Sequence, residues 1–317
     1  MADGSNTRET NKAASQLLYL LSVREKKSRF YLWNKYIGPG RKNLFKRIVF
    51  LREKYLWYVF HKITKYRFFK TKSKTFWGKD IAITKDSSLR YGFIFDPTEF
   101  RLTRFLIKHL KEDDVFYDIG ANIGFYSMLA GELLLREIHC FEPMPDVFKM
   151  LTSNLGGLKN VYKNEIALSD REDNMTLFEI GDKAGFGTTV NAVADTYRNE
   201  AISEIRIKST TLRTYLRDHR KPTVIKLDVE GAESKVIDGG AEFLRDNSPL
   251  IVMEAWGGEK GKLFSSKAIE KLYGLGYESF IINYEGEIES AQYIDTSSIR
   301  DLENFVFCKK DAIHLYK

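Results

Sequence analysis

A glycine-bearing turn between two short apolar segments is the part of this chain best suited to hold a ligand. Residues 115–118 form the first segment, and the turn after it carries Gly120 and Gly124. The second segment, at 137–141, ends in Glu142. Such a turn lets a ligand approach the backbone closely, and an acid at the end of the second strand can accept hydrogen bonds from a ribose diol. The pattern therefore predicts a site for an adenosine-containing cofactor.

The charge of the turn distinguishes between candidate cofactors. The dinucleotide fingerprint is G-x-G-x-x-G, but here Asp118 precedes Gly120, and Asn122 stands where the second glycine would be. A carboxylate at this place would repel a pyrophosphate, whereas it suits the cationic amino-acid moiety of S-adenosylmethionine. Glu142 would then hold the ribose hydroxyls. Taken alone, Asp118 could be a helix N-cap and Glu142 a surface acid, but together they favour S-adenosylmethionine over NAD.

Alternating strands and helices are expected to position these residues. The strands are expected at 115–118, 137–141, 160–163, 223–227, 249–254, 277–283 and 304–308, and the helices at 99–111, 123–135, 145–155, 210–218, 232–245 and 264–274. This alternation predicts a parallel sheet with helices on both faces. Residues 164–209 interrupt it with strand-like stretches around a glycine-containing loop at 181–187.

Four stretches, in this order, resemble the FkbM family of S-adenosylmethionine-dependent methyltransferases. They are Phe116–Asn122 with Gly124, Phe141-Glu142-Pro143, residues 164–170 and residues 225–233. The last stretch reads IKLDVEGAE and matches the family's K-x-D-V-E-G-x-E run. The resemblance covers residues 90–310 approximately. It implies an α/β class I methyltransferase fold, which is Rossmann-like and has a seven-stranded, mostly parallel sheet with one late antiparallel strand.

The resemblance also assigns residues to the cofactor. The methionine and turn region would be lined by Asp118, Gly120, Ala121, Asn122 and Gly124, the ribose would be held by Glu142 beside Pro143, and the adenine would be flanked by Glu165, Ile166 and Ala167. Asp228 would lie near the sulfonium and the acceptor.

Methyl transfer to a hydroxyl requires the removal of one proton, so a base or a metal should assist. The candidate catalytic residues are Asp228, Glu230 and Glu254. Asp228 and Glu254 follow predicted parallel strands, where either could accept a proton or bind a divalent cation. Class I O-methyltransferases occur with and without a metal, so the sequence leaves the cation undecided. Glu230 and Glu233 could instead cap the helix that begins after Gly231.

Positive charge is concentrated in the N-terminal part of the chain. Residues 1–90 carry 22 Lys and Arg against 6 Asp and Glu, a net charge of +16, whereas the remainder has a net charge of −9. Residues 1–16 are polar and expected to be disordered, and 17–89 form a basic, aromatic extension with an amphipathic helix at 43–68. The methyltransferase domain is expected at 90–317.

Three roles are open for the aromatic stretch at 17–77. It could pack on the catalytic domain as a helical cap, associate peripherally with an anionic membrane surface, or bind single-stranded nucleic acid. Nucleic acid is the least favoured partner, because the rest of the chain is acidic. No secretory signal and no apolar run near ~20 residues is visible, and the two cysteines lie in apolar segments. These features predict a cytoplasmic protein, and the membrane role, one of the three left open, would place it at the inner face of a membrane.

The resemblance implies the acceptor only as a class. Family members often modify sugars, so a hydroxyl of a glycan, polysaccharide or glycolipid is expected, with a small-molecule natural product as the alternative. The chain could also be a non-catalytic scaffold that binds S-adenosylmethionine, or a nicotinamide oxidoreductase. The intact turn argues against the scaffold, and the missing glycine argues against the oxidoreductase. The oligomeric state is not determined by the sequence.

Overall fold

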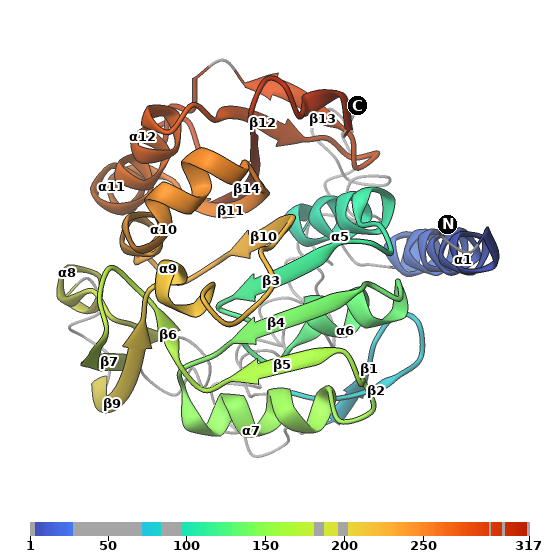
Figure 1. Cartoon of the computed structure of the whole chain (residues 1–317), viewed down its shortest axis with the longest axis horizontal. Helices are drawn as coiled ribbons and strands as arrows, with labels where there is room; N and C mark the ends of the chain where they lie inside the picture. The colour runs from blue at the N-terminus through green and yellow to red at the C-terminus, as the bar shows by residue number, and fades with distance from the viewer. Residues whose placement is uncertain are drawn as a thin grey trace, which may run out of the picture.

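The computed structural model describes residues 4–27, 72–83, 97–180, 187–195, 202–291, 293–299 and 302–315. Eight strands form the main sheet. They are β3 (Val115–Ile119), β4 (Glu137–Phe141), β5 (Val161–Asn164), β10 (Val224–Leu227), β11 (Leu250–Trp256), β12 (Glu278–Ile282), β13 (Ile288–Ala291) and β14 (Leu302–Cys308). Their order is β13-β12-β14-β11-β10-β3-β4-β5 (Figure 1).

Most of the main sheet is parallel, as the sequence predicts. Strands β5, β4, β3, β10 and β11 pair in parallel, and β14 pairs antiparallel with both β11 and β12. β14 is the late antiparallel strand that the family resemblance implies. The expected number of seven strands is wrong by one, because the chain turns after β12 at Gly286, where φ is +76°, and returns as the antiparallel edge strand β13.

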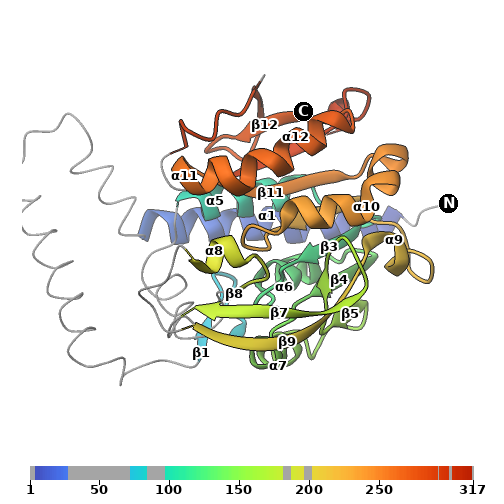
Figure 2. The same cartoon turned by 90° about the vertical axis from the view of Figure 1, so that its left-hand side faces the viewer.

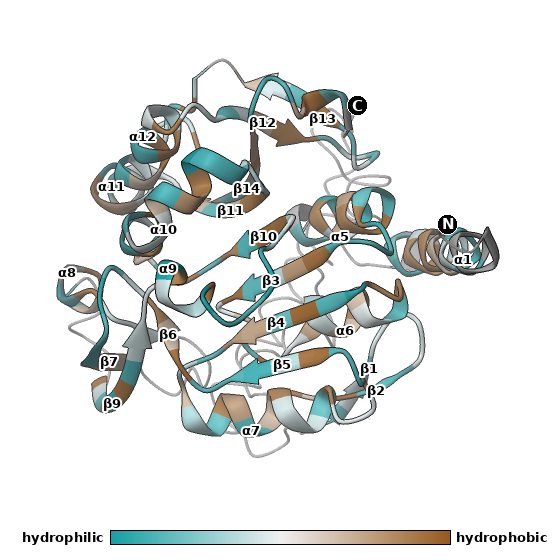
Figure 3. Ribbon diagram, viewed as in Figure 1, coloured by the Kyte–Doolittle hydropathy of each residue, from teal (hydrophilic) through white to brown (hydrophobic). Residues whose placement is uncertain are grey.

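Helices cover both faces of the main sheet. They are α5 (Pro97–His109), α6 (Phe125–Glu132), α7 (Pro145–Asn154), α9 (Leu212–Tyr215), α10 (Glu233–Asn247), α11 (Gly258–Lys260) and α12 (Ser266–Gly274), with a π-turn at Gly261–Ser265 and a 3₁₀ turn at Ile313–Leu315. A further short helix, α8 (Asn191–Asp195), packs on a second, smaller sheet. Successive strand residues alternate between the faces: Phe116 packs with α5 and α6, and Tyr117 packs with α9 and α10. Two apolar cores result, and Figure 3 shows the apolar residues gathered on the strands between them.

A separate four-stranded sheet stands beyond the carboxyl ends of the main strands. It has the order β6-β9-β7-β8 and consists of β6 (Ala167–Leu168), β7 (Asp173–Ile180), β8 (Gly187–Thr188) and β9 (Ile202–Thr210). In Figure 1 the arrows of β3, β4 and β5 point towards it. It corresponds to the predicted interruption of the alternation at 164–209, and residues 181–186 of the glycine-containing loop lie outside the described residues.

The N-terminus differs from the expectation of disorder at 1–16. Helix α1 (Gly4–Lys27) runs through most of these residues and packs against α5. Leu17 and Leu21 are buried there, and Arg104 of α5 forms an ion pair with Glu25 at 2.5 Å. The polar composition concealed these contacts because only one side of the helix is buried. Among the described residues, no helix combines the length and the apolar composition needed to cross a bilayer.

A short hairpin follows in the extension, formed by β1 (Lys72–Lys74) and β2 (Asp80–Ala82). Asn154 of α7 binds both the amide and the carbonyl of Ala82, at 2.7 and 3.0 Å. The hairpin therefore belongs to the body of the protein. The amphipathic helix expected at 43–68 lies outside the described residues.

Docking of α1 can be tested by removing its buried leucine. Leu21→Ala should lower the free energy of unfolding by about 2–4 kcal/mol, because Leu21 is fully buried against the body of the protein. Urea unfolding of the full chain measures this loss. Tyr19→Ala is the matched control, since Tyr19 is 68% exposed and its loss should cost less than about 0.5 kcal/mol. Equal losses for the two variants would contradict the docked position of α1.

Candidate active site

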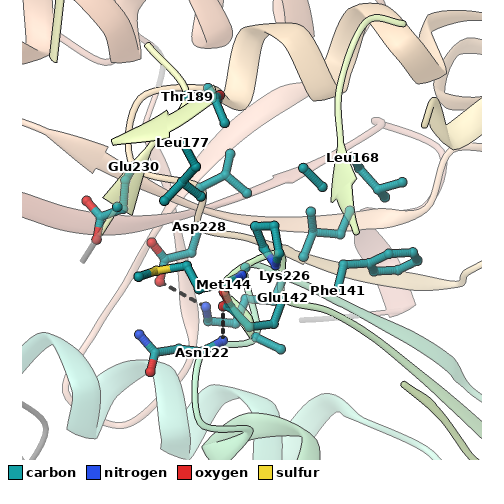
Figure 4. Close-up of a pocket in the computed structure, with 18 of the residues that line it drawn as sticks. Asn122, Phe141, Glu142, Met144, Leu168, Leu177, Thr189, Lys226, Asp228 and Glu230 are labelled. Atoms are coloured by element: carbon teal, nitrogen blue, oxygen red, sulfur yellow. Dashed lines mark hydrogen bonds and ion pairs between the residues drawn. The ribbon is translucent and has the colours of Figure 1, made fainter. Parts of the chain in front are cut away.

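A cavity opens at the carboxyl ends of β3, β4 and β10, the edge at which open α/β sheets bind ligands. Most of its lining comes from four groups of residues, which are 119–123, 141–144, 166–168 and 228–230. Figure 4 shows Asp228 and Glu230 on one side of the cavity and Phe141 and Leu168 on the other. The cavity therefore has an acidic end and an apolar end.

The glycine turn after β3 lies directly against the end of β10. Gly120 has a φ of +79°, and a Cβ built on it would lie only 1.8 Å from the carbonyl oxygen of Asp228. The amides of Gly120 and Ala121 both donate to the carbonyl of Phe141, at 3.0 Å. Only glycine fits this position, because any side chain would separate the two strand ends.

Glu142 is fixed by two backbone amides. Its Oε2 accepts from the amide of Asn122 at 3.0 Å, and its Oε1 accepts from the amide of Met144 at 2.9 Å. The side chain is only 6% exposed. Burial raises the pKa of Glu142 to about 7, and the nearby Asp118 and Asp228 carboxylates add to this effect. Each oxygen keeps a further lone pair, so the carboxylate can accept two hydroxyl groups from a bound diol.

Asp118 does not line the cavity, although the family resemblance implies a place for it beside the methionine moiety. It is 1% exposed, and its Oδ2 accepts from the hydroxyl of Ser127 on α6 at 2.6 Å. Its Oδ1 lies 3.9 Å from Nζ of Lys226. Burial raises the pKa of Asp118. The alternation of side chains along β3 explains the placement, because Asp118 shares the α6 side with Phe116.

Lys226 links the buried strands to the acidic end of the cavity. Its Nζ donates to Oδ2 of Asp228 at 3.0 Å and lies 5.2 Å from the ring centre of Tyr126. Burial alone would lower the pKa of Lys226, but the Asp228 and Asp118 carboxylates outweigh it and raise the pKa. The lysine therefore stays charged and fixes the orientation of Asp228.

The three acids expected to be catalytic come together. Carboxylate oxygens of Asp228, Glu230 and Glu254 lie within 4.8 Å of one another. Burial, followed by repulsion from Asp228 and Glu230, raises the pKa of Glu254 well above its usual range. Asp228 and Glu230 line the cavity, whereas Glu254 is not among the lining residues. Such a group can share a proton or bind a hard divalent cation, and the cation remains a prediction.

The remaining predicted residues divide between the cavity and its surroundings. Ile166 and Ala167 line the apolar end, whereas Glu165 is exposed and lies outside the lining. Gly124 also lies outside the lining and packs near Leu151 of α7. Glu233, the first residue of α10, accepts from the amides of Val229 and Gly231, both at 3.2 Å, so it holds the turn before the helix. The expectation that it caps the helix is wrong, because the cap position is Ala232 and no side chain caps it.

Several lining residues escaped the sequence analysis. Glu99 of α5 accepts a hydrogen bond from the hydroxyl of Tyr126 of α6, and both residues line the cavity. Leu177, Gly187 and Thr189 reach it from the small sheet. No local pattern marks these positions, because each is brought to the site by an element whose own sequence is ordinary.

The arrangement agrees with a match to a known protein family. A family model described as the methyltransferase FkbM domain matches residues 118–279, which contain the Gly120 turn, Glu142 and Asp228. The chain belongs to the FkbM methyltransferase family. Asp228 and Glu230, at the acidic end of the cavity, lie in the stretch that resembles the family's K-x-D-V-E-G-x-E run.

Individual relatives of this FkbM family member are distant. The chain is 29% identical over 150 residues to the hexuronic acid methyltransferase AglP of Haloferax volcanii, and this match covers 47% of this chain and 59% of AglP. It is 26% identical over 179 residues to the methyltransferase SdnD of Sordaria araneosa, covering 47% of this chain and 69% of SdnD. The first alignment thus spans less than two thirds of the relative.

Solved structures were found at low similarity. An FkbM methyltransferase of Methylobacillus flagellatus aligns with a TM-score of 0.40 and 12% identity, over 62% of this chain and 44% of that one. Fibrillarin of Aeropyrum pernix, solved with S-adenosylmethionine bound, aligns with a TM-score of 0.37 and 16% identity, over 66% of this chain and 74% of that one.

Proposed function

We propose that this FkbM family member is an S-adenosylmethionine-dependent O-methyltransferase that methylates a sugar hydroxyl of a glycan, polysaccharide or glycolipid. The observation that carries the proposal is Glu142, a buried carboxylate at the end of β4 whose oxygens are held by the amides of Asn122 and Met144. Both amides fix the carboxylate in one orientation beside the glycine turn, where it can accept the two hydroxyls of a ribose.

The two ends of the cavity suit the two ends of this cofactor. Phe141, Ile166 and Leu168 offer an apolar surface for an adenine ring, next to Glu142. Asp228 and Glu230 offer negative charge for a cationic sulfonium at the opposite end. S-adenosylmethionine supplies a methyl group on a positively charged sulfur, which needs no further activation by the protein.

The protein's own part in the reaction is alignment and the transfer of one proton. An acceptor hydroxyl beside Asp228 would receive the methyl group that the cofactor supplies, and the hydroxyl proton would pass to a carboxylate of the acidic end. Lys226 holds Asp228 in place through a 3.0 Å hydrogen bond, so Asp228 is the oriented acceptor of that proton. Positioning of this kind contributes up to about 7–11 kcal/mol in favourable geometry.

The acceptor is proposed from the relatives rather than from the cavity. AglP is named as a hexuronic acid methyltransferase, which supports a sugar. The link to an anionic membrane rests on the basic stretch at 17–77, and residues 28–71 of it lie outside the described residues. Membrane association, a cytoplasmic location and a small-molecule acceptor as the alternative therefore remain predictions.

Two measurements on the full chain test the proposal. Calorimetry should show binding of S-adenosylmethionine and no binding of NAD, and binding of NAD alone would overturn the methyltransferase assignment. Radiolabelled methyl groups should then pass from S-adenosylmethionine to glycans extracted from cells that lack the gene. Label found only in a small-molecule fraction would favour the natural-product acceptor.

Asp228→Asn should lower the rate of methyl transfer without weakening the binding of the cofactor. We expect turnover on the labelled glycan fraction to fall about 100-fold or more, because asparagine cannot take up the proton, while affinity for S-adenosylhomocysteine changes less than about threefold. Asp238→Asn on the exposed side of α10 is the matched control and should leave both values unchanged. Full turnover by Asp228→Asn would remove Asp228 from the catalytic residues.

A further inference from the structure

The turn that follows β10 has an unusual backbone. Glu230 has a φ of +53° and Gly231 a φ of +94°, so two consecutive residues lie in the left-handed region. Glycine adopts this conformation freely, but a residue with a long side chain rarely does so without outside support. The orientation of Glu230, and with it the acidic end of the cavity, therefore depends on the contacts that hold this turn.

One of these contacts comes from the small sheet, more than forty residues earlier in the chain. The hydroxyl of Thr188, in β8, donates to the carbonyl of Glu230 at 2.8 Å. The same hydroxyl oxygen accepts from the amide of Val190 at 3.1 Å, so the donor is held in one orientation. Thr188 is only 1% exposed, which shields the hydrogen bond from water.

The segment after Thr188 packs on the same turn. A Cβ built on Gly231 would lie 2.8 Å from Cγ2 of Val193, a fully buried residue of α8. Figure 2 shows β8 and α8 as neighbours beside the longer strand β7. Residues 187–195, called the covering segment below, therefore pack on the turn. They make one polar contact at Glu230 and one apolar contact at Gly231.

The covering segment also borders the cavity. Gly187 and Thr189 line it, whereas the Thr188 hydroxyl binds the Glu230 carbonyl. In Figure 4, Thr189 and Leu177 lie on the same side of the cavity as Glu230 and Asp228. Thr188 thus connects the wall formed by the small sheet to the acids at the end of β10.

We infer that Thr188 is a positioning residue, which holds the Asp228–Gly231 turn so that the acids face the sulfonium of the bound cofactor. The inference rests on the proposed function. Loss of the hydroxyl leaves the Glu230 carbonyl without this donor, and the turn relaxes towards a more favourable φ. The Glu230 carboxylate then moves relative to the sulfur, while Asp228, which Lys226 holds, Glu142 and the apolar end keep their places.

The test compares two ligands that differ at the sulfur. S-adenosylmethionine carries a positive sulfonium and S-adenosylhomocysteine a neutral sulfur, so the ratio of their affinities reports the negative charge next to that atom. Calorimetry on the full chain should show that Thr188→Val reduces the preference for S-adenosylmethionine by about fivefold relative to the wild type, with S-adenosylhomocysteine affinity kept within twofold.

Three further variants test whether the effect comes from the Thr188 hydroxyl. Thr188→Ser keeps the hydroxyl and should restore the wild-type ratio, and Thr188→Ala replaces the valine variant if that variant does not fold. Thr176→Val, in β7 and outside the cavity lining, is the matched control and should leave the ratio unchanged. A wild-type ratio in the folded Thr188→Val or Thr188→Ala protein would overturn the inference, as would equal loss of affinity for both ligands. A wild-type protein that binds neither ligand would overturn the proposed function as well.

Discussion

Gly120→Ala is expected to abolish cofactor binding and to lower the free energy of unfolding by more than about 3 kcal/mol. The added Cβ would lie 1.8 Å from the carbonyl oxygen of Asp228, which is a backbone atom and cannot rotate away. The residue must also keep a φ of +79°. The overlap can be relieved only if β3 and β10 separate where they border the cavity. Cofactor affinity and the free energy of unfolding should therefore fall together. Calorimetry with S-adenosylhomocysteine and urea unfolding measure the two effects.

Gly78→Ala is a control that shows the effect of backbone strain at a positive φ without steric overlap of the added Cβ. Gly78 lies in the hairpin between β1 and β2, has a φ of +94°, and has no atom within 4 Å of a built Cβ. Its replacement should therefore cost only the conformational strain of about 1–2 kcal/mol and leave binding unchanged. If Gly120→Ala behaved like Gly78→Ala, the close approach of the turn to Asp228 would be disproved.

Glu142→Gln should weaken S-adenosylhomocysteine binding by about 10-fold to 150-fold. A charged acceptor contributes about 1.5–3 kcal/mol to each hydrogen bond, and an amide offers one acceptor oxygen where the carboxylate offers two. In the free protein the pKa of Glu142 is raised to about 7. Binding favours the ionised form, so wild-type affinity should rise with pH up to about 7 and then level off.

The steepness with which affinity changes with pH tests whether Glu142 is the group that titrates. Below pH 7 the wild-type affinity should change by up to about tenfold per pH unit, and Glu142→Gln should lose that dependence. Glu165→Gln is the matched control, because Glu165 is exposed and outside the lining. An unchanged slope in Glu142→Gln would assign the titration to another buried acid, of which Glu233 has a pKa raised to about 7.

The sequence by itself determined which strand ends carry the site and which glycine and acidic residues lie there. Glycines and acids that follow short apolar strands mark the carboxyl edge of a parallel sheet, so the chain itself places Gly120, Glu142 and Asp228 at one cavity. Seven of the eight strands of the main sheet, and the helices that connect them, follow from local hydrophobic patterns, which are continuous in the chain. Lys226, which lies inside the apolar strand β10, pairs with the Asp228 carboxylate that follows the same strand.

Only the tertiary structure decided which way the side chains face and which distant segments complete the site. Asp118 is next to the glycine turn in sequence, yet the pleat of β3 directs it to Ser127 and away from the cavity. Glu99, Thr188 and the buried side of α1 have no local signal, because their roles come from contacts with residues tens of positions away. A hydrophobic pattern records that a residue is buried, but its partner is fixed by how the elements pack together.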